Sequence, residues 1–97
     1  MTLPVVWIPE ANKDLLEARA WYVNIRPELG ERFALAVEAT VEALSEHPLQ
    51  FPLVYRSMRR AGVRRFPYGL FFEVQQHQIV IFACFHGRRN PTHWQAR

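Results

Sequence analysis

Residues 68–86 read YGLFFEV, QQHQ and IVIFACFH, and this stretch decides the fold class. Its two apolar runs have the length of strands, and β-branched and aromatic residues dominate them. The polar residues 75–78 between the runs predict a tight turn. The second run is apolar on both faces, which is typical of a central strand with helices covering one side. By simple alternation, its two faces carry Ile79, Ile81, Ala83 and Phe85 against Val80, Phe82 and Cys84.

The first half of the chain shows helical spacing after a short opening strand at 3–8. Pro4 indicates that the start of this strand is at an edge or lies outside the ladder. Pro9 suits the first turn of a helix, and Arg26-Pro27 breaks that helix and begins a second one. His47-Pro48 ends the second helix. The apolar stripe of the first helix comprises Ala11, Leu15, Ala18, Trp21 or Tyr22, and Ile25. The buried face of the second helix comprises Phe33, Val37, Val41 and Leu44.

Between the helices and residue 68, the residues 54–56 and 63–66 have the composition of strands, with a turn at Ala61-Gly62. The predicted order is strand, helix, helix, then a three-stranded antiparallel meander (β-α-α-β-β-β). Such a chain forms a two-layer α+β domain, with the N-terminal strand and a helical hairpin packed on an antiparallel sheet. Residues 1–97 are enough for one domain and too few for two.

Charge is divided unevenly along the chain. Residues 10–46 contain eight acids and four bases, a net charge of −4, whereas residues 47–97 contain eight arginines and one acid, Glu73, a net charge of +7. Clustered like charges repel one another, and a partner of opposite charge offsets that cost. The second half is therefore expected to bind something anionic. The residues expected to bind it are Arg59, Arg60, Arg64, Arg65, Tyr68, Arg88, Arg89 and Trp94.

Several functional classes are disfavoured by composition. The single cysteine forms no internal disulfide, and with no apolar leader the chain fits a reducing cytoplasm. No apolar run approaches the roughly 18–20 residues that cross a bilayer, so no membrane partner is expected. One cysteine and four scattered histidines lack metal-ligand spacing, and no glycine-rich phosphate loop occurs. We expect neither a metal nor another cofactor.

The residues that most clearly suggest a chemical activity begin at His86, at the end of the last predicted strand. A neutral imidazole there has the chemistry to move the proton of a ribose 2′-hydroxyl, and arginines beside it stabilise a phosphorane-like transition state. His86, Arg65 and Arg88 are thus the candidate catalytic residues of a metal-free ribonuclease, with Tyr68 available for stacking. The alternative is structural: His86 bonds a backbone carbonyl, and the arginines form a solvated or docking surface. These signals favour binding over catalysis.

The chain resembles the toxins of the RelE/ParE superfamily, which belong to bacterial type II toxin–antitoxin modules. The resemblance rests on VRRFPYGLFFEV at 63–74, IVIFACF at 79–85 and HGRRNP at 86–91. WIPEA at 7–11, HP at 47–48 and FP at 51–52 fit as well, so it spans nearly the whole chain. The superfamily's fold, a helical hairpin on one face of an antiparallel sheet, agrees with the periodicity.

The resemblance implies two alternative activities. The RelE-like branch cleaves messenger RNA on the ribosome, whereas the ParE-like branch is associated with poisoning DNA gyrase and with plasmid stabilisation. The second half of this chain has no lysine, which departs from a lysine-rich RelE-type site and favours the ParE-like branch. A third possibility is a non-toxic basic binding module of the same fold. In both branches an acidic, partly disordered antitoxin wraps the toxin, which implies a toxin–antitoxin hetero-oligomer.

Overall fold

The structure is a computed structural model, and it describes residues 2–87. Those residues form five strands, two long helices and one short 3₁₀ helix. In chain order these are β1 (Val5–Trp7), α1 (Pro9–Ile25), α2 (Pro27–Glu46), η1 (Pro48–Gln50), β2 (Leu53–Tyr55), β3 (Met58–Gly62), β4 (Tyr68–Val74) and β5 (Ile79–His86).

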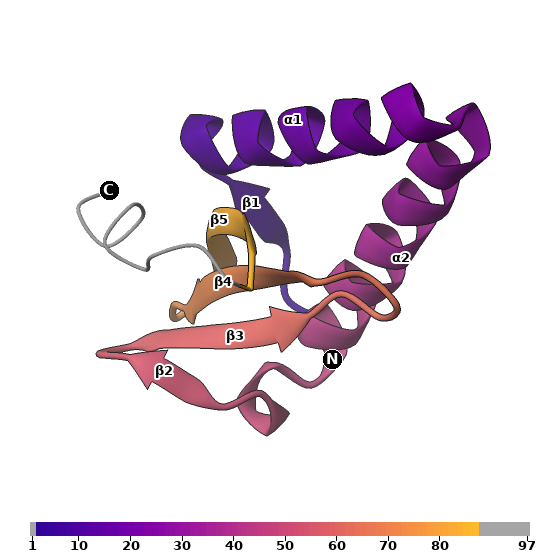
Figure 1. Cartoon of the computed structure of the whole chain (residues 1–97). Coiled ribbons are helices and arrows are strands. Elements are labelled where there is room, and N and C mark those ends of the chain that lie inside the picture. The colour runs from indigo at the N-terminus through magenta and orange to yellow at the C-terminus, as the bar shows by residue number, and fades with distance from the viewer. Residues whose placement is uncertain (1, 88–97) are drawn as a thin grey trace.

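The strands make one mixed sheet in the order β1-β5-β4-β3-β2, and α1 and α2 diverge from their junction on one side of it (Figure 1). β1 runs parallel to β5, and every other pair is antiparallel. The predicted two-layer α+β class is confirmed. β5 lies between β1 and β4, so the doubly apolar run has a neighbour on each side, as its composition predicts. The turn at 75–78 is closed by Gln75 N donating to Gln78 O over 2.8 Å.

The region between the helices and β4 differs from the prediction. Residues 63–66 form no strand, and Ala61-Gly62 is not a turn; Met58–Gly62 is the strand, paired with β4 from Met58↔Glu73 to Gly62↔Gly69. Arg65 has a φ of 70°, which no strand accommodates. Four strands therefore follow the helices instead of three. Two adjacent arginines in the middle of β3 gave the segment too little apolar alternation to be recognised.

β5 also differs from the prediction, because its residues do not alternate regularly between the two sheet faces along the whole strand. The β4–β5 register shifts between Phe71 and Phe72, since Phe71 lies opposite Ala83 and Phe72 opposite Ile81. This β-bulge inserts one residue and reverses the alternation beyond it. Ile79, Ile81 and Cys84 join the main core beneath the helices, whereas Ala83 and Phe85 belong to a second apolar cluster.

The α1 stripe is narrower than the sequence predicts. Tyr22 and not Trp21 turns inward, and Trp21 is 63% exposed. Ile25, expected in the stripe, is 54% exposed because the chain has by then reached the junction with α2. At that junction a Cβ on Gly30 would lie 2.2 Å from Val23 Cγ2, so glycine permits the close approach of the two helices.

An aromatic cluster joins the helices to the sheet. The ring of Phe33, on α2, is fully buried and lies 5.1 Å from that of Tyr22, 5.2 Å from Phe66 and 5.3 Å from Tyr68, measured between ring centroids. Its neighbours come from α1, from the β3–β4 loop and from the start of β4. The pairs of Phe33 with Phe66 and Tyr68 are edge to face, and such pairs add to the free energy that the buried area itself contributes.

Replacement of Phe33 by alanine is expected to lower the free energy of unfolding by about 3–5 kcal/mol, because it empties the centre of this cluster. Urea denaturation measures the change. The matched control is Leu35→Ala on the same helix, where the side chain is 63% exposed and the expected change is within about 0.5 kcal/mol. Equal effects of the two substitutions would show that the cluster does not hold the helices on the sheet.

Candidate functional site

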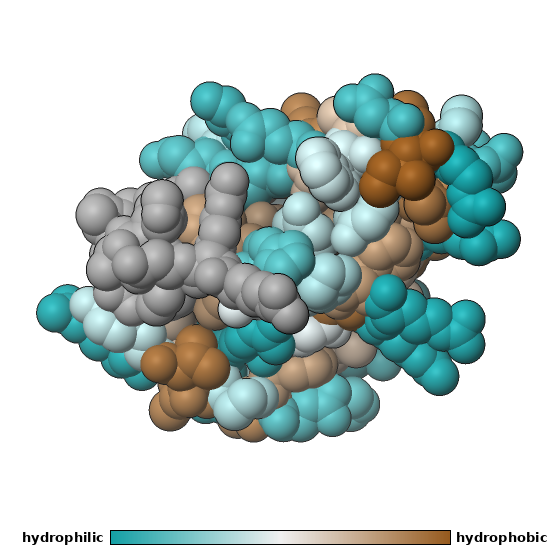
Figure 2. Space-filling model, in the orientation of Figure 1, coloured by the Kyte–Doolittle hydropathy of each residue, from teal (hydrophilic) through white to brown (hydrophobic). Residues whose placement is uncertain are grey.

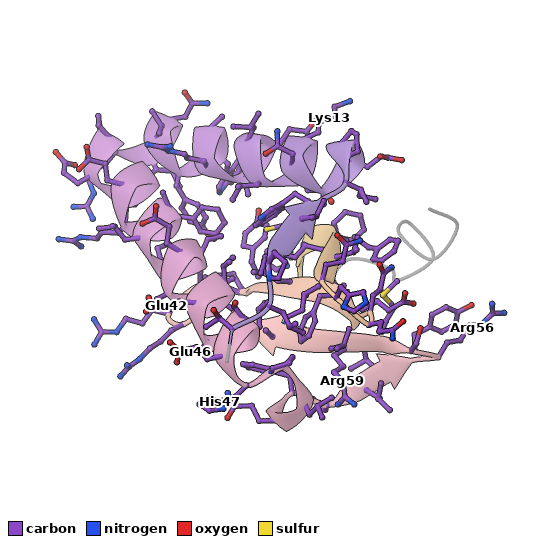
Figure 3. All side chains as sticks on the ribbon, turned by 180° about the vertical axis from the view of Figure 1, so that it is seen from behind. Lys13, Glu42, Glu46, His47, Arg56 and Arg59 are labelled. Carbon is purple, nitrogen blue, oxygen red and sulfur yellow. The ribbon has the colours of Figure 1, made fainter. Side chains whose placement is uncertain are left out.

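The arginine doublet on β3 is divided between the two faces of the sheet, as neighbouring strand residues must be. Arg59 points toward η1, where its Nη1 donates to Phe51 O over 2.6 Å and to Leu49 O over 3.4 Å. Figure 3 shows Arg59 beside this segment, while Arg56 projects from the tip of the β2–β3 hairpin. Arg60 lies on the opposite face, with its Cζ 6.0 Å from the centroid of the Phe71 ring. Arg59 is thus occupied by a structural role.

Arg64 and Arg65 lie in the β3–β4 loop and are exposed. The loop is closed by Val63 N donating to Tyr68 O over 2.8 Å, and Gly87 N donates to Pro67 O over 2.7 Å. Figure 2 shows hydrophilic residues projecting where Figure 1 places this loop. Both arginines therefore present their charge beside α2 and away from the sheet face on which Arg60 lies.

A groove of about 790 Å³ separates this loop from α2. Its floor is mainly apolar and its rim carries three cations, Arg32, Arg64 and Arg65. The small side chains of α2 leave room for a partner along one side of that helix. They are Ala36, Ala39, Thr40 and Ala43, with Leu29 and Leu35 beside them and Phe51 and Phe66 opposite.

His86 ends β5 and lies opposite Tyr68 in the β4–β5 register. Their rings meet edge to face with centroids 5.5 Å apart. Because of the bulge in β5, His86 faces α1, where it lines a smaller pocket of about 190 Å³. Asp14, Glu17 and Trp21 of α1 form the other wall of that pocket. Among residues 2–87, the side chains that line this pocket with the candidate catalytic histidine include two acids and two aromatic rings and no arginine or lysine.

Asp14 belongs to α1 and is only 8% exposed, because it faces the sheet. It lies where the sheet edge is left open by the unequal lengths of β1 and β5. β1 pairs only with Ile79–Ile81, while β5 continues to His86. Beyond the end of β1, the backbone N–H of Cys84 donates to Asp14 Oδ2 over 3.2 Å. A buried backbone donor without an acceptor is costly, so a carboxylate here completes the sheet edge. The sequence signal was an acid three residues after Ala11, inside the apolar stripe of α1.

Burial, with Asp14 nearby, raises the pKa of the Cys84 thiol to about 12. Burial likewise raises the pKa of Tyr22, with Tyr68 contributing. The thiolate is the nucleophilic form of cysteine, so the raised pKa makes Cys84 a poor nucleophile at neutral pH. The pocket beside His86 thus contains no activated nucleophile among the residues that the structure describes.

Two of the three proposed ribonuclease residues do not share one cavity. Arg65 lines the groove on α2, whereas His86 lines the pocket on α1. Arg88, Arg89 and Trp94, also expected at the site, lie outside the described residues. Within 2–87 there is no group of three or more histidine, cysteine or acidic side chains placed to hold a metal ion. No helix in that range is long and apolar enough to cross a membrane.

Comparison with known families matches residues 5–91 to the ParE toxin of the type II toxin–antitoxin system parDE. The chain belongs to this toxin family. The match runs from β1 through the whole sheet, and so it covers both the groove and the pocket. No curated protein matches the chain.

Two solved structures resemble the whole domain. One is from a chromosomal ParDE toxin–antitoxin system of P. aeruginosa, with 21% identity and a TM-score of 0.77, covering 88% of this chain and 96% of that one. The other is from the toxin–antitoxin complex RelBE2 of Mycobacterium tuberculosis, with 25% identity and a TM-score of 0.62, covering 89% and 92%. The ParE-type fold of this chain thus has counterparts in both kinds of module.

The raised pKa of Cys84 predicts a large difference in thiol reactivity between the folded and unfolded protein. From a reference pKa of 9.0 and a folded pKa of about 12, the thiolate fraction at pH 8 falls roughly a thousandfold on folding. Reaction with a disulfide reagent such as DTNB should therefore be at least about a hundredfold slower in the native protein than in urea. A native rate close to the unfolded rate would contradict the burial of this thiol.

Proposed function

We propose that this ParE-family chain arrests bacterial growth by inhibiting DNA gyrase inside the cell, and that a cognate acidic antitoxin neutralises it. The ParE-like branch is the one associated with gyrase. The observation that carries the proposal is the separation of Arg65 from His86 in two different cavities. A toxin that acts by binding needs a surface and no assembled catalytic set.

The electrostatics of the His86 pocket support binding over RNA cleavage. RNA cleavage needs positive groups around the scissile phosphate. Of the residues that the structure describes, Asp14 and Glu17 are the charged ones that line this pocket with His86, and their carboxylates repel a phosphate brought to the imidazole. The metal-free RelE-like ribonuclease is accordingly the less favoured alternative, and the non-toxic binding module is the remaining one.

The groove along α2 supports the antitoxin part of the proposal. It combines an apolar floor with Arg32, Arg64 and Arg65 at its rim, and it is long enough for a partner segment to lie along the helix. An amphipathic helix with acidic residues flanking its apolar face matches that chemistry. Such a segment gains burial from the floor and charge neutralisation from the rim, which offsets the cost of ordering it.

Purified protein is expected to inhibit ATP-dependent supercoiling by gyrase and to leave translation of a reporter messenger RNA in a cell-free extract intact. The physical reason is that the proposed toxin acts by binding the enzyme, while Arg65 and His86, the described candidates for RNA cleavage, line different cavities. Addition of the antitoxin should restore supercoiling. Normal supercoiling at saturating toxin, together with cleaved transcripts, would reject gyrase as the target and support the ribonuclease.

Ala39→Glu should weaken antitoxin binding by about tenfold or more, because it places a carboxylate and extra bulk on the apolar floor of the groove. The matched control is Ala20→Glu, the same change at an exposed position of α1 that lies outside the groove. Calorimetric titration of antitoxin into each folded variant measures the affinity. Equal affinities for the two variants would place the antitoxin on another surface.

A further inference from the structure

The outer edge of β1 presents backbone hydrogen-bonding groups to its surroundings. β1 is the first strand in the sheet order β1-β5-β4-β3-β2, so β5 is its one neighbour in the sheet. Pro4 O accepts from Ile79 N over 2.8 Å, which shows that residue 4 faces β5. Because successive residues of a strand direct their backbone groups to opposite sides, the N–H and C=O groups of Val5 and Trp7 point away from β5. Within residues 2–87, no hydrogen bond engages these outward groups.

The two edges of the sheet differ in how they are protected from pairing with another strand. The other edge strand, β2, has an irregular register between Leu53 and Tyr55 and is followed by Arg56, whose φ is 50°. Irregular register and charge are features that keep an edge strand from pairing with a second chain. β1 reads Val-Val-Trp, carries no charge and pairs with β5 in unbroken register. β1 is therefore the less protected edge.

A groove of about 690 Å³ lies beside this edge, between α1 and α2. In Figure 3, β1 lies between the ribbons of these two helices. The walls of the groove are mainly apolar, and Leu16 of α1 is 57% exposed there. The apolar residues of the walls include Val5, Trp7, Leu15, Leu16, Val37 and Val41. A strand added to β1 would therefore gain apolar contacts as well as backbone hydrogen bonds.

The rim of this groove carries charges of both signs. Arg19 lies on α1, whereas Glu38 and Glu42 lie on α2, and all three are exposed. No ion pair joins Arg19 to either glutamate within the described part of the chain. The two glutamates repel an acidic segment or a nucleic acid, in contrast to the three arginines that line the groove beside the β3–β4 loop. A complementary partner presents a cation to α2 and an anion to α1.

A second copy of the chain meets this requirement by symmetry. α1 begins just beyond Trp7, at one end of β1, and α2 ends at the other, where Ser45 Oγ donates to Leu3 O over 2.7 Å. A two-fold axis that passes through the edge of β1, normal to the sheet, exchanges these two ends. It places α1 of one copy opposite α2 of the other. Arg19 of each copy then faces the glutamates of the second copy.

We propose that two copies of this chain dimerise by antiparallel pairing of β1 with β1, so that their sheets become continuous. The two-fold axis passes between the two Val6 residues, and Val5 of each copy exchanges hydrogen bonds with Trp7 of the other. The Val6 side chains, 45% exposed in the single chain, cover each other. The groove on α2 and the pocket at His86 share no lining residue with this interface, so the dimer leaves both accessible.

Disulfide cross-linking tests where the two copies meet. A non-hydrogen-bonded antiparallel pair has Cα atoms about 4.5 Å apart, which is within the range of a disulfide. Val6→Cys should therefore form a covalent dimer under mild oxidation, at least about tenfold faster than Val54→Cys. Val54 is the matched control, because it is 47% exposed and lies on the other edge strand. The native Cys84 is buried and should not cross-link.

Sedimentation equilibrium of the full chain measures dimerisation itself. The wild type should pass from monomer to dimer between about 1 and 500 μM, the range of a small interface. Val6→Lys should weaken dimerisation by about tenfold or more, because it places two like charges face to face at the axis. Arg19→Glu should weaken it by about three- to tenfold, and adding Glu38→Arg and Glu42→Arg to that variant should restore it. Circular dichroism confirms that each variant is folded.

Three results would overturn this assignment. A wild type that stays monomeric over the whole concentration range shows that β1 does not pair with itself. If Val6→Cys cross-links no faster than Val54→Cys, or Val6→Lys dimerises as tightly as the wild type, the dimer uses another surface. If the wild type is monomeric and purified antitoxin shields the thiol of Val6→Cys from alkylation, the groove belongs to the antitoxin. The inference does not rest on the proposed function, and the supercoiling assay tests that function separately.

Discussion

The packing of Phe33 against Tyr22, Phe66 and Tyr68 connects every layer of this domain. The four rings come from α2, α1, the β3–β4 loop and β4, so one buried cluster sets the position of both helices on the sheet. Because Phe66 packs in this cluster, the preceding Arg64 and Arg65 are held at the surface beside α2. The groove along that helix exists because the loop is pinned at Phe66 while the small side chains of α2 leave space.

The described arginines of the second half, which lie between residues 56 and 65, do not make one basic patch. Strand alternation sends Arg59 to the backbone carbonyls of the η1 segment and Arg60 to the opposite face, and the following loop carries Arg64 and Arg65 to the rim of a groove. The uneven charge of the chain is thus distributed over separate sites with different neighbours. An acidic partner that contacts more than one of them has to wrap around the domain, which is the behaviour expected of a segment that folds on binding.

The pocket at His86 depends on two departures from regular sheet geometry. β1 ends at Trp7 while β5 continues, which opens the edge that Asp14 completes, and the bulge opposite Phe71 turns Cys84 and His86 toward α1. Without the bulge, alternation would place His86 on the same face as Arg60. A single inserted residue therefore turns the histidine away from the sheet face of Arg60 and toward Asp14 and Glu17 of α1.

The sequence by itself determined the fold class, both helices, the β4–β5 pair and the buried face of α2, because long periodic runs carry those signals locally. It also carried the family resemblance, which the comparison confirmed. The sequence did not predict β3, because Arg59 and Arg60 interrupt the apolar pattern of that strand. It also predicted a strand at Arg64 and Arg65, which lie in the following loop. Only the tertiary structure decided which side chains meet: the bulge in β5 appears in the pairing of β4 with β5, and the contact of Asp14 with Cys84 joins residues 70 positions apart, so neither follows from the pattern of one segment.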